Sequence, residues 1–295
     1  MIKTAFTIMV LAVVSVSARV ETVRLQSKLV NATLPYTVVL PTDYDTSPNT
    51  RYPVLYLLHG LSGHYSDWIT RTNVADYAAQ YRMIVVTPEG NDSWYTDSAT
   101  VPTDKYESYI LKELIPDVQV RYRTIEARYG RAIAGLSMGG YGSLKFGLKS
   151  PATFIFVGSM SGAFGASHAS EQESGATRWA SSLKIFGPPD SETRRANDLF
   201  LLVKALTPES IASLPFFYFD CGTEDAAYIF SHNHEFATLM SEKKIPHEYR
   251  ELPGDHSWGY WDKQVQEVLK IAAQRMRMPP SAPSPNSSKI KERSH

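Results

Sequence analysis

The chain has 295 residues, of which 43% are hydrophobic and 20% charged, and its 30 basic residues balance its 30 acidic ones. The apolar fraction excludes a chain that is disordered throughout, and zero net charge argues against nucleic acid or an anionic membrane surface as the main partner. The single cysteine, Cys221, cannot close an intrachain disulfide, and the sequence has no Cys/His pairs at zinc-finger spacing.

The two ends differ in composition from the rest of the chain. After a basic residue near the start, the sequence is apolar from Ala5 to Val14 and ends in small or β-branched residues. This pattern predicts a secretory signal peptide over residues 1–18, cleaved after Ala18, and therefore a secreted or periplasmic protein. Stable membrane anchoring is not expected, because a spanning helix needs about 20 apolar residues. Residues 279–295, rich in Pro, Ser and charge, predict a disordered tail.

Short apolar runs divide the remaining chain, residues 19–278. Residues 19–29 and 33–40 predict an antiparallel pair of strands at its start. Continuous apolar runs, typical of strands buried on both faces of a parallel sheet, follow, with a more polar last strand. These runs lie at residues 53–58, 83–87, 131–134, 154–157, 216–219 and 247–252.

Helical patterns lie between these runs, at residues 73–81, 105–116, 140–149, 226–243 and 261–278. Their alternation with strands predicts one α/β domain with a mostly parallel, doubly wound sheet, whose ligand site lies at the carboxyl ends of the strands. Residues 162–214 interrupt the alternation, and we expect them to form a small, lid-like helical insertion over that edge.

A glycine-flanked serine lies between one of these strands and the next helix. In Gly135-Leu-Ser-Met-Gly139, the glycines allow a sharp turn that holds the Ser137 hydroxyl above the sheet. This is the nucleophile elbow of the α/β-hydrolase fold. The Gly-x-Ser-x-Gly pattern alone is weak evidence, because it arises by chance in about one chain of this size in ten. Its position between a predicted strand and a predicted helix is what supports the interpretation.

A serine nucleophile needs a base to take its proton and an acid to orient that base, in the chain order Ser, Asp or Glu, His. His256 is the predicted base, because it is the only histidine between the last predicted strand and the tail. Three carboxylates compete as the acid: Asp220, Glu224 and Asp225. Asp225 is favoured, since it follows the turn at Gly222 and opens a helix, but chain order leaves the other two open.

Ester hydrolysis also needs N–H donors for the oxyanion. The residue after the nucleophile, Met138, supplies one. The second is assigned to Leu61, in the glycine-containing loop that follows the first parallel strand. His59 in the same loop is interpreted as a buried residue whose hydrogen bonds hold the loop.

Three aromatic residues, Trp94, Tyr95 and Trp258, lie beside these motif loops. Aromatic side chains can line an acyl or sugar pocket, and they can equally pack the loops against one another. The sequence leaves both interpretations open.

Six motifs together resemble the esterase D family, which includes S-formylglutathione hydrolases, tributyrin-type, feruloyl and acetylxylan esterases, and mycolyltransferases. The resemblance covers nearly all of residues 20–278 and implies the same triad and the same oxyanion donors. It also implies that the acid is Asp225. A reaction carried by these side chains needs no metal or organic cofactor. The motifs are LLHGLSG at 57–63, WYTD at 94–97, EL at 113–114, GLSMGG at 135–140, GTED at 222–225 and GDHSWGYW at 254–261.

The sequence therefore predicts a secreted serine carboxylesterase for short-chain acyl or polysaccharide-linked acetyl or feruloyl esters. Long lipids fit less well, because no extended apolar lid is evident. A mycolyltransferase-type acyltransferase and an S-formylglutathione hydrolase-like thioesterase are the enzymatic alternatives, the latter disfavoured by the signal peptide. A non-catalytic binding module would have no need for an intact Ser137, Asp225 and His256 set.

Overall fold

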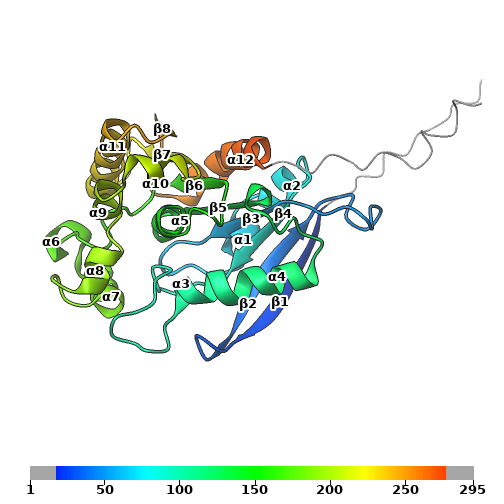
Figure 1. Cartoon of the computed structure of the whole chain (residues 1–295), viewed down its shortest axis with the longest axis horizontal. Helices are drawn as coiled ribbons and strands as arrows, with labels where there is room; N and C mark the ends of the chain where they lie inside the picture. Colours follow the sequence, from blue (N-terminus) through cyan, green and yellow to red (C-terminus); the bar gives the residue numbers. More distant parts are fainter. Residues whose placement is uncertain (1–17, 277–295) are drawn as a thin grey trace, which may run out of the picture.

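The computed structural model describes residues 18–276, so the predicted tail and all but the last residue of the predicted signal peptide lie outside the described residues. Within that range one eight-stranded sheet crosses the molecule in the order β1-β2-β4-β3-β5-β6-β7-β8 (Figure 1). The strands are β1 Arg19–Ser27, β2 Ala32–Leu40, β3 Val54–Leu58, β4 Ile84–Pro88, β5 Arg131–Leu136, β6 Phe156–Met160, β7 Phe216–Gly222 and β8 His247–Leu252.

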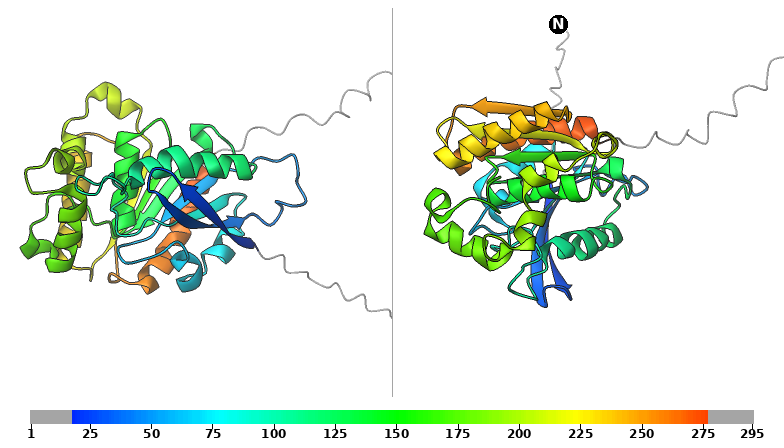
Figure 2. Two further views of the ribbon diagram at one scale, coloured as in Figure 1. Left: turned by 90° about the horizontal axis from the view of Figure 1, so that it is seen from below. Right: turned by 60° about the vertical axis from the view of Figure 1, so that its left-hand side comes forward.

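The sheet is parallel except at one edge. β1 pairs antiparallel with β2, and β2 antiparallel with β4, whereas all other neighbours run parallel. Figure 2 shows the β1–β2 ribbon projecting at the opposite edge from β8. Each predicted strand is confirmed within a few residues. The inner parallel strands were predictable from the continuous apolar runs that doubly covered strands require.

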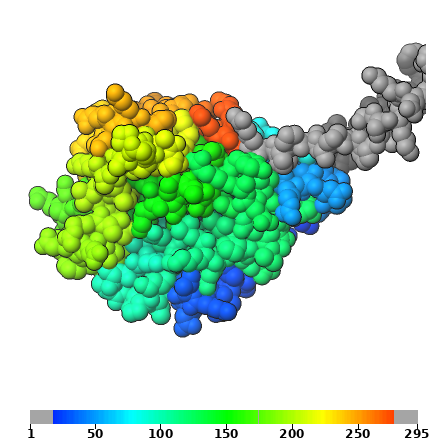
Figure 3. Space-filling model, viewed as in Figure 1, coloured from blue at the N-terminus to red at the C-terminus, as the bar shows by residue number. Residues whose placement is uncertain are grey.

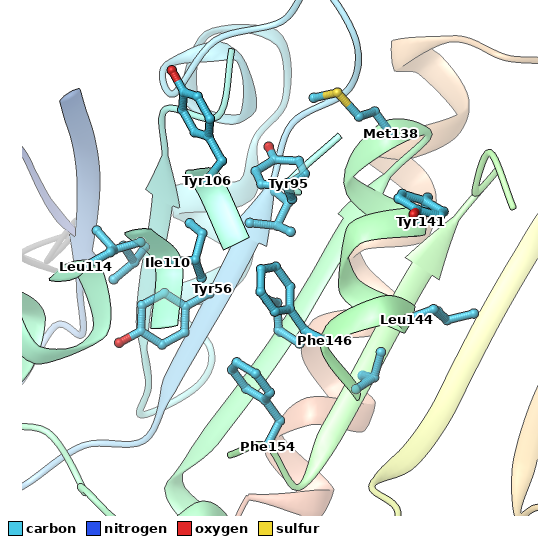
Figure 4. Close-up of a cluster of buried hydrophobic side chains, with 14 of the residues drawn as sticks. Tyr56, Tyr95, Tyr106, Ile110, Leu114, Met138, Tyr141, Leu144, Phe146 and Phe154 are labelled. Carbon is cyan, nitrogen blue, oxygen red and sulfur yellow. The ribbon is translucent and has the colours of Figure 1, made fainter. Parts of the chain in front are cut away.

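Both faces of the sheet are covered by helices, and β3 shows the division. Tyr56 points into the larger core, where α5 and α11 pack, while Leu55 and Leu57 point into the second core, beneath α2 and α12. Figure 4 shows Tyr56 and Phe146 of α5 among the buried side chains of the larger core. The covering helices are α1 Asp67–Arg71, α2 Val74–Ala78, α3 Tyr106–Tyr109, α4 Ile115–Arg121, α5 Met138–Lys149, α11 Ala227–Glu242 and α12 Trp258–Arg275.

The helix predicted to end at Pro116 continues to Arg121, so the expected boundary was wrong. A π-helical turn, η1 Ile110–Leu114, joins α3 to α4, and Pro116 lies in the first turn of α4. Proline is tolerated there, because the wide turn before it relieves the clash and the lost hydrogen bond that proline causes inside a regular helix. Helix α1 was not predicted, and α2 is shorter than expected.

The segment predicted as a helical insertion lies between β6 and β7 and holds five short helices in the described chain. Part of it belongs to the main core, since Phe186 and Leu199 are fully buried. The space-filling view shows it continuous with the body of the molecule (Figure 3). The insertion therefore both extends the core and reaches the carboxyl edge of the sheet. Its helices are α6 Glu171–Ser174, α7 Ala176–Phe186, α8 Glu192–Ala196, α9 Leu199–Lys204 and α10 Pro208–Ala212.

Candidate active site

The turn between β5 and α5 holds Ser137 in a strained conformation. Its φ is 51°, in the left-handed region that non-glycine residues rarely adopt, and its N–H donates to the carbonyl oxygen of Met160 at 3.0 Å. A Cβ at Gly139 would lie 2.6 Å from the carbonyl oxygens of Leu58 and His59. Only glycine therefore lets α5 begin this close to the end of β3.

Ser137, His256 and Asp225 form one hydrogen-bonded chain. Ser137 Oγ lies 3.0 Å from His256 Nε2, and His256 Nδ1 lies 3.0 Å from Asp225 Oδ2. An ionised carboxylate only accepts hydrogen bonds, so Nδ1 carries the imidazole proton and Nε2 is left to accept the serine proton. The Asp225 side chain is fully buried, whereas 23% of the imidazole side chain is exposed. The His256 imidazole is thus accessible from the cleft above Ser137.

The loops that carry Asp225 and His256 contact each other directly. Glu224 N–H donates to the Gly254 carbonyl oxygen at 2.9 Å, and a Cβ at Gly222 would lie 2.2 Å from that same oxygen. Asp225 Oδ1 accepts the N–H of Ala226 at 2.7 Å, which fixes the carboxylate with Oδ2 towards His256. Glycine at position 222 is therefore what allows the two loops to approach.

The other two carboxylates have different surroundings. Glu224 is exposed. Asp220 is fully buried within β7, and its Oδ1 accepts the Tyr260 hydroxyl at 2.7 Å. Burial raises the pKa of Asp220 to about 7, although the hydrogen bond from Tyr260 opposes the rise. Of the three, only Asp225 contacts His256 within the described structure.

This buried acid predicts a pH-dependent change in stability for Asp220→Asn. Between the ordinary carboxyl pKa of about 4 and the folded value, the folded state binds more protons than the unfolded state, so the free energy of unfolding falls as pH rises. Asparagine removes that fall. We expect the free energy of unfolding of the variant, minus that of the wild type, to increase by about 4 kcal/mol between pH 4 and pH 8.

Urea denaturation at several pH values measures this difference. The exposed Glu224→Gln serves as control and should follow the wild type throughout. Parallel curves for Asp220→Asn and the wild type would show that Asp220 ionises normally in the folded protein.

The two predicted oxyanion donors lie at the carboxyl ends of β3 and β5. Within residues 18–276, neither the Leu61 nor the Met138 N–H donates to a protein acceptor. His59, 1% exposed, accepts the Gly90 N–H through Nε2 at 2.9 Å and donates from Nδ1 to the Gly60 carbonyl oxygen at 2.7 Å. The interpretation of His59 as a buried support of this loop is confirmed.

A cleft of about 410 Å³ opens above Ser137 and His256. Its walls come from the loop at residues 60–63, from α1, and from the first turns of α7 and α12. The insertion contributes Thr177 and Arg178, which no sequence motif marked. Among the described residues, no three His, Cys, Asp or Glu side chains gather as a candidate metal site.

The three aromatic residues predicted to bind substrate have different surroundings in the structure. Trp258 lines the cleft. Tyr95 is fully buried, its hydroxyl donates to the His59 carbonyl oxygen at 3.1 Å, and its own carbonyl oxygen accepts from the buried Lys145 ammonium at 2.6 Å. Trp94, 2% exposed, donates from Nε1 to Ser181 Oγ at 2.9 Å. Trp94 and Tyr95 therefore pack the loops against one another. Contrary to the prediction that they bind substrate, neither of them lines this cleft.

The family described as "Putative esterase" matches residues 27–271. The chain belongs to this esterase family. The esterase is 27% identical to an acetyl esterase of Caldicellulosiruptor saccharolyticus, over 73% of this chain and 81% of the relative. A solved ferulic acid esterase is 29% identical, with a TM-score of 0.76 over 89% of this chain and all of that one.

A further relative of the esterase carries a different name. The diacylglycerol acyltransferase/mycolyltransferase Ag85A of Mycobacterium leprae is 28% identical over 78% of this chain and 77% of the relative. The predicted α/β-hydrolase fold and the resemblance to esterase D relatives are confirmed, and the esterase is a carboxylic ester hydrolase.

Proposed function

We propose that the esterase hydrolyses short-chain acyl esters, or acetyl and feruloyl esters linked to polysaccharide, through a Ser137–His256–Asp225 triad and an acyl-enzyme intermediate. The hydrogen-bonded chain of these three side chains beneath an open cleft carries the proposal. Relatives named acetyl esterase and ferulic acid esterase support the substrate class. Export is proposed with it, on the secretory pattern of residues 1–18.

In the proposed reaction, Ser137 Oγ attacks the ester carbonyl carbon while His256 Nε2 takes the serine proton. Asp225 stabilises the imidazolium, and the N–H groups of Leu61 and Met138 bind the oxyanion. Collapse of the intermediate breaks the bond to the alcohol, which leaves with the proton from His256. The same imidazole then deprotonates a water that attacks the acyl-enzyme and releases the acid.

Labelling with a fluorophosphonate, followed by peptide mapping, tests the nucleophile. We expect one modified residue, Ser137. A panel of 4-nitrophenyl esters from acetyl to octanoyl, with methyl ferulate and acetylated xylan, tests the substrate class, and we expect kcat/KM to be highest for the shorter chains. Absence of both labelling and hydrolysis would exclude the proposed function and favour a binding module.

Acyl transfer to a sugar hydroxyl is a second candidate, favoured by the relationship to a mycolyltransferase. It uses the same acyl-enzyme, and differs only in what attacks it. Hydrolysis in the presence of trehalose or other sugar acceptors distinguishes the two. Free acid as the main product at every acceptor concentration supports hydrolysis, whereas acylated sugar supports transfer.

A further inference from the structure

The charges that line the cleft are unevenly distributed. Apart from His256, its charged lining side chains are Arg71, Arg178 and Asp67. The two arginines come from α1 and from α7, elements separated by more than 100 positions in the sequence. Besides His256, two cationic side chains and one anionic side chain therefore line the cleft that contains Ser137.

Asp67 neutralises Arg71 only in part. Arg71 Nε lies 3.5 Å from Asp67 Oδ1, and the arginine side chain is 56% exposed. Asp67 also supports its own loop, because Oδ2 accepts the His64 N–H at 3.0 Å. Solvent reaches the arginine of this pair and screens its attraction to Asp67, so the Arg71 guanidinium can contact a bound anion without a large loss. It lies 5.6 Å from the ring centre of Trp258, which also lines the cleft.

Arg178 is half-buried, with its guanidinium 5.4 Å from the ring centre of Tyr228. The helix that carries it is held firmly against the body of the protein. Ser181 Oγ accepts from Trp94 Nε1 at 2.9 Å, and the Ile185 carbonyl oxygen accepts the Ala99 N–H at 2.7 Å. A guanidinium held in this way loses little freedom on binding, and its planar set of donors matches a carboxylate.

From this arrangement we infer that the cleft selects esters that carry a carboxylate, with Arg178 as its main binding residue and Arg71 as a second contact. The inference rests on the proposed function, because it concerns the substrate of the same site. The carboxylate can belong to the acyl group or to the alcohol, since both parts of an ester extend from the carbonyl held at Ser137. The partial burial of Arg178 strengthens such a contact relative to one on an open surface.

Paired substrates test the inference and locate the charge. For the alcohol, 4-acetoxybenzoate is compared with 4-acetoxybenzamide. For the acyl group, the 4-nitrophenyl monoester of adipic acid is compared with 4-nitrophenyl hexanoate. We expect kcat/KM to favour the acidic member of at least one pair by about 10- to 100-fold at low salt, which is the usual size of a charge-assisted hydrogen bond. The preference should shrink as NaCl is added.

Arg178→Gln should remove most of this preference by raising KM for the acidic ester, while the neutral ester keeps its kcat/KM within about threefold. Arg71→Gln should give a smaller loss in the same direction. The matched control is Arg195→Gln, which removes the same charge from an exposed residue of the insertion and should leave both esters unchanged. An equal loss on acidic and neutral esters would show that Arg178 is structural and would overturn the inference.

Binding to Ser137→Ala, which leaves the esters intact, gives a readout that does not depend on turnover. Calorimetry should give a Kd about 10-fold or more lower for the acidic member of the preferred pair. Equal Kd values for both members of both pairs would overturn the inference, even if the wild type hydrolyses neutral esters. Selective binding of the acidic ester without any Ser137-dependent hydrolysis would instead overturn the proposed function alone.

Discussion

Replacing Ser137 by alanine is expected to lower kcat for 4-nitrophenyl acetate by at least about 10³-fold while the fold is retained. The covalent route is lost, and only substrate positioning and the oxyanion donors remain. The Ser137 hydroxyl contacts His256, so its removal leaves the backbone hydrogen bonds of the elbow intact. Alanine also meets the same backbone constraint as serine at a φ of 51°. Initial rates and thermal unfolding followed by circular dichroism measure the two parts of this prediction.

Ser143→Ala is the matched control, since Ser143 lies on the same helix, is fully buried and donates to the Gly139 carbonyl oxygen at 2.8 Å. We expect it to keep wild-type kcat within a few-fold and to remain a target of fluorophosphonate at Ser137. If Ser137→Ala retained more than a few per cent of the wild-type kcat, another nucleophile would have to carry the reaction.

The strands and the chain order of Ser137, Asp225 and His256 could be predicted because strong local constraints set them. Strands covered on both faces are almost entirely apolar, as in β3 and in β5 after its first residue, Arg131. The elbow at Ser137 has a sequence signature because a close backbone approach requires glycine at position 139. The position of His256 follows from the chain order of the fold.

Features that depend on tertiary contacts could not be predicted in this way. Trp94 and Tyr95 both adopt positive φ values, 52° and 48°, and the buried Lys145 ammonium holds the Tyr95 carbonyl oxygen. Nothing in the local sequence distinguishes such a loop from one that opens towards a substrate. The π turn before Pro116 likewise departs from the regular helix on which periodicity depends.

The two arginines that line the cleft, Arg71 and Arg178, were not predicted from the sequence for a related reason. Arg71 lies on a five-residue helix and Arg178 on a helix of the insertion, and neither belongs to a motif. Only the fold brings them to the same cleft as Ser137. The lining of the cleft therefore depends on contacts between distant segments, whereas Ser137, Asp225 and His256 belong to short motifs at strand ends.

Replacing Asp225 by asparagine is expected to lower kcat by about 10³- to 10⁴-fold, and the surrounding hydrogen bonds give the reason. Oδ1 accepts the Ala226 N–H at 2.7 Å, so the amide oxygen of asparagine will occupy that position and turn its NH₂ group towards His256. An NH₂ donor facing Nδ1 favours the imidazole tautomer with its proton on Nε2. That nitrogen can then no longer accept the proton of Ser137, and stabilisation of the imidazolium is also lost.

Steady-state kinetics with 4-nitrophenyl acetate and the rate of fluorophosphonate labelling measure this loss, and both should fall together, because each requires deprotonation of Ser137. Glu224→Gln makes the same change of chemistry one residue away on an exposed side chain, and its kcat should stay within about threefold of the wild type. A large loss in Glu224→Gln with a small loss in Asp225→Asn would reverse the assignment of the acid. The contrast between these two neighbouring residues therefore tests the role of the 3.0 Å contact between Asp225 and His256. That contact is expected to keep the imidazole proton on Nδ1, so that Nε2 can accept the proton of Ser137.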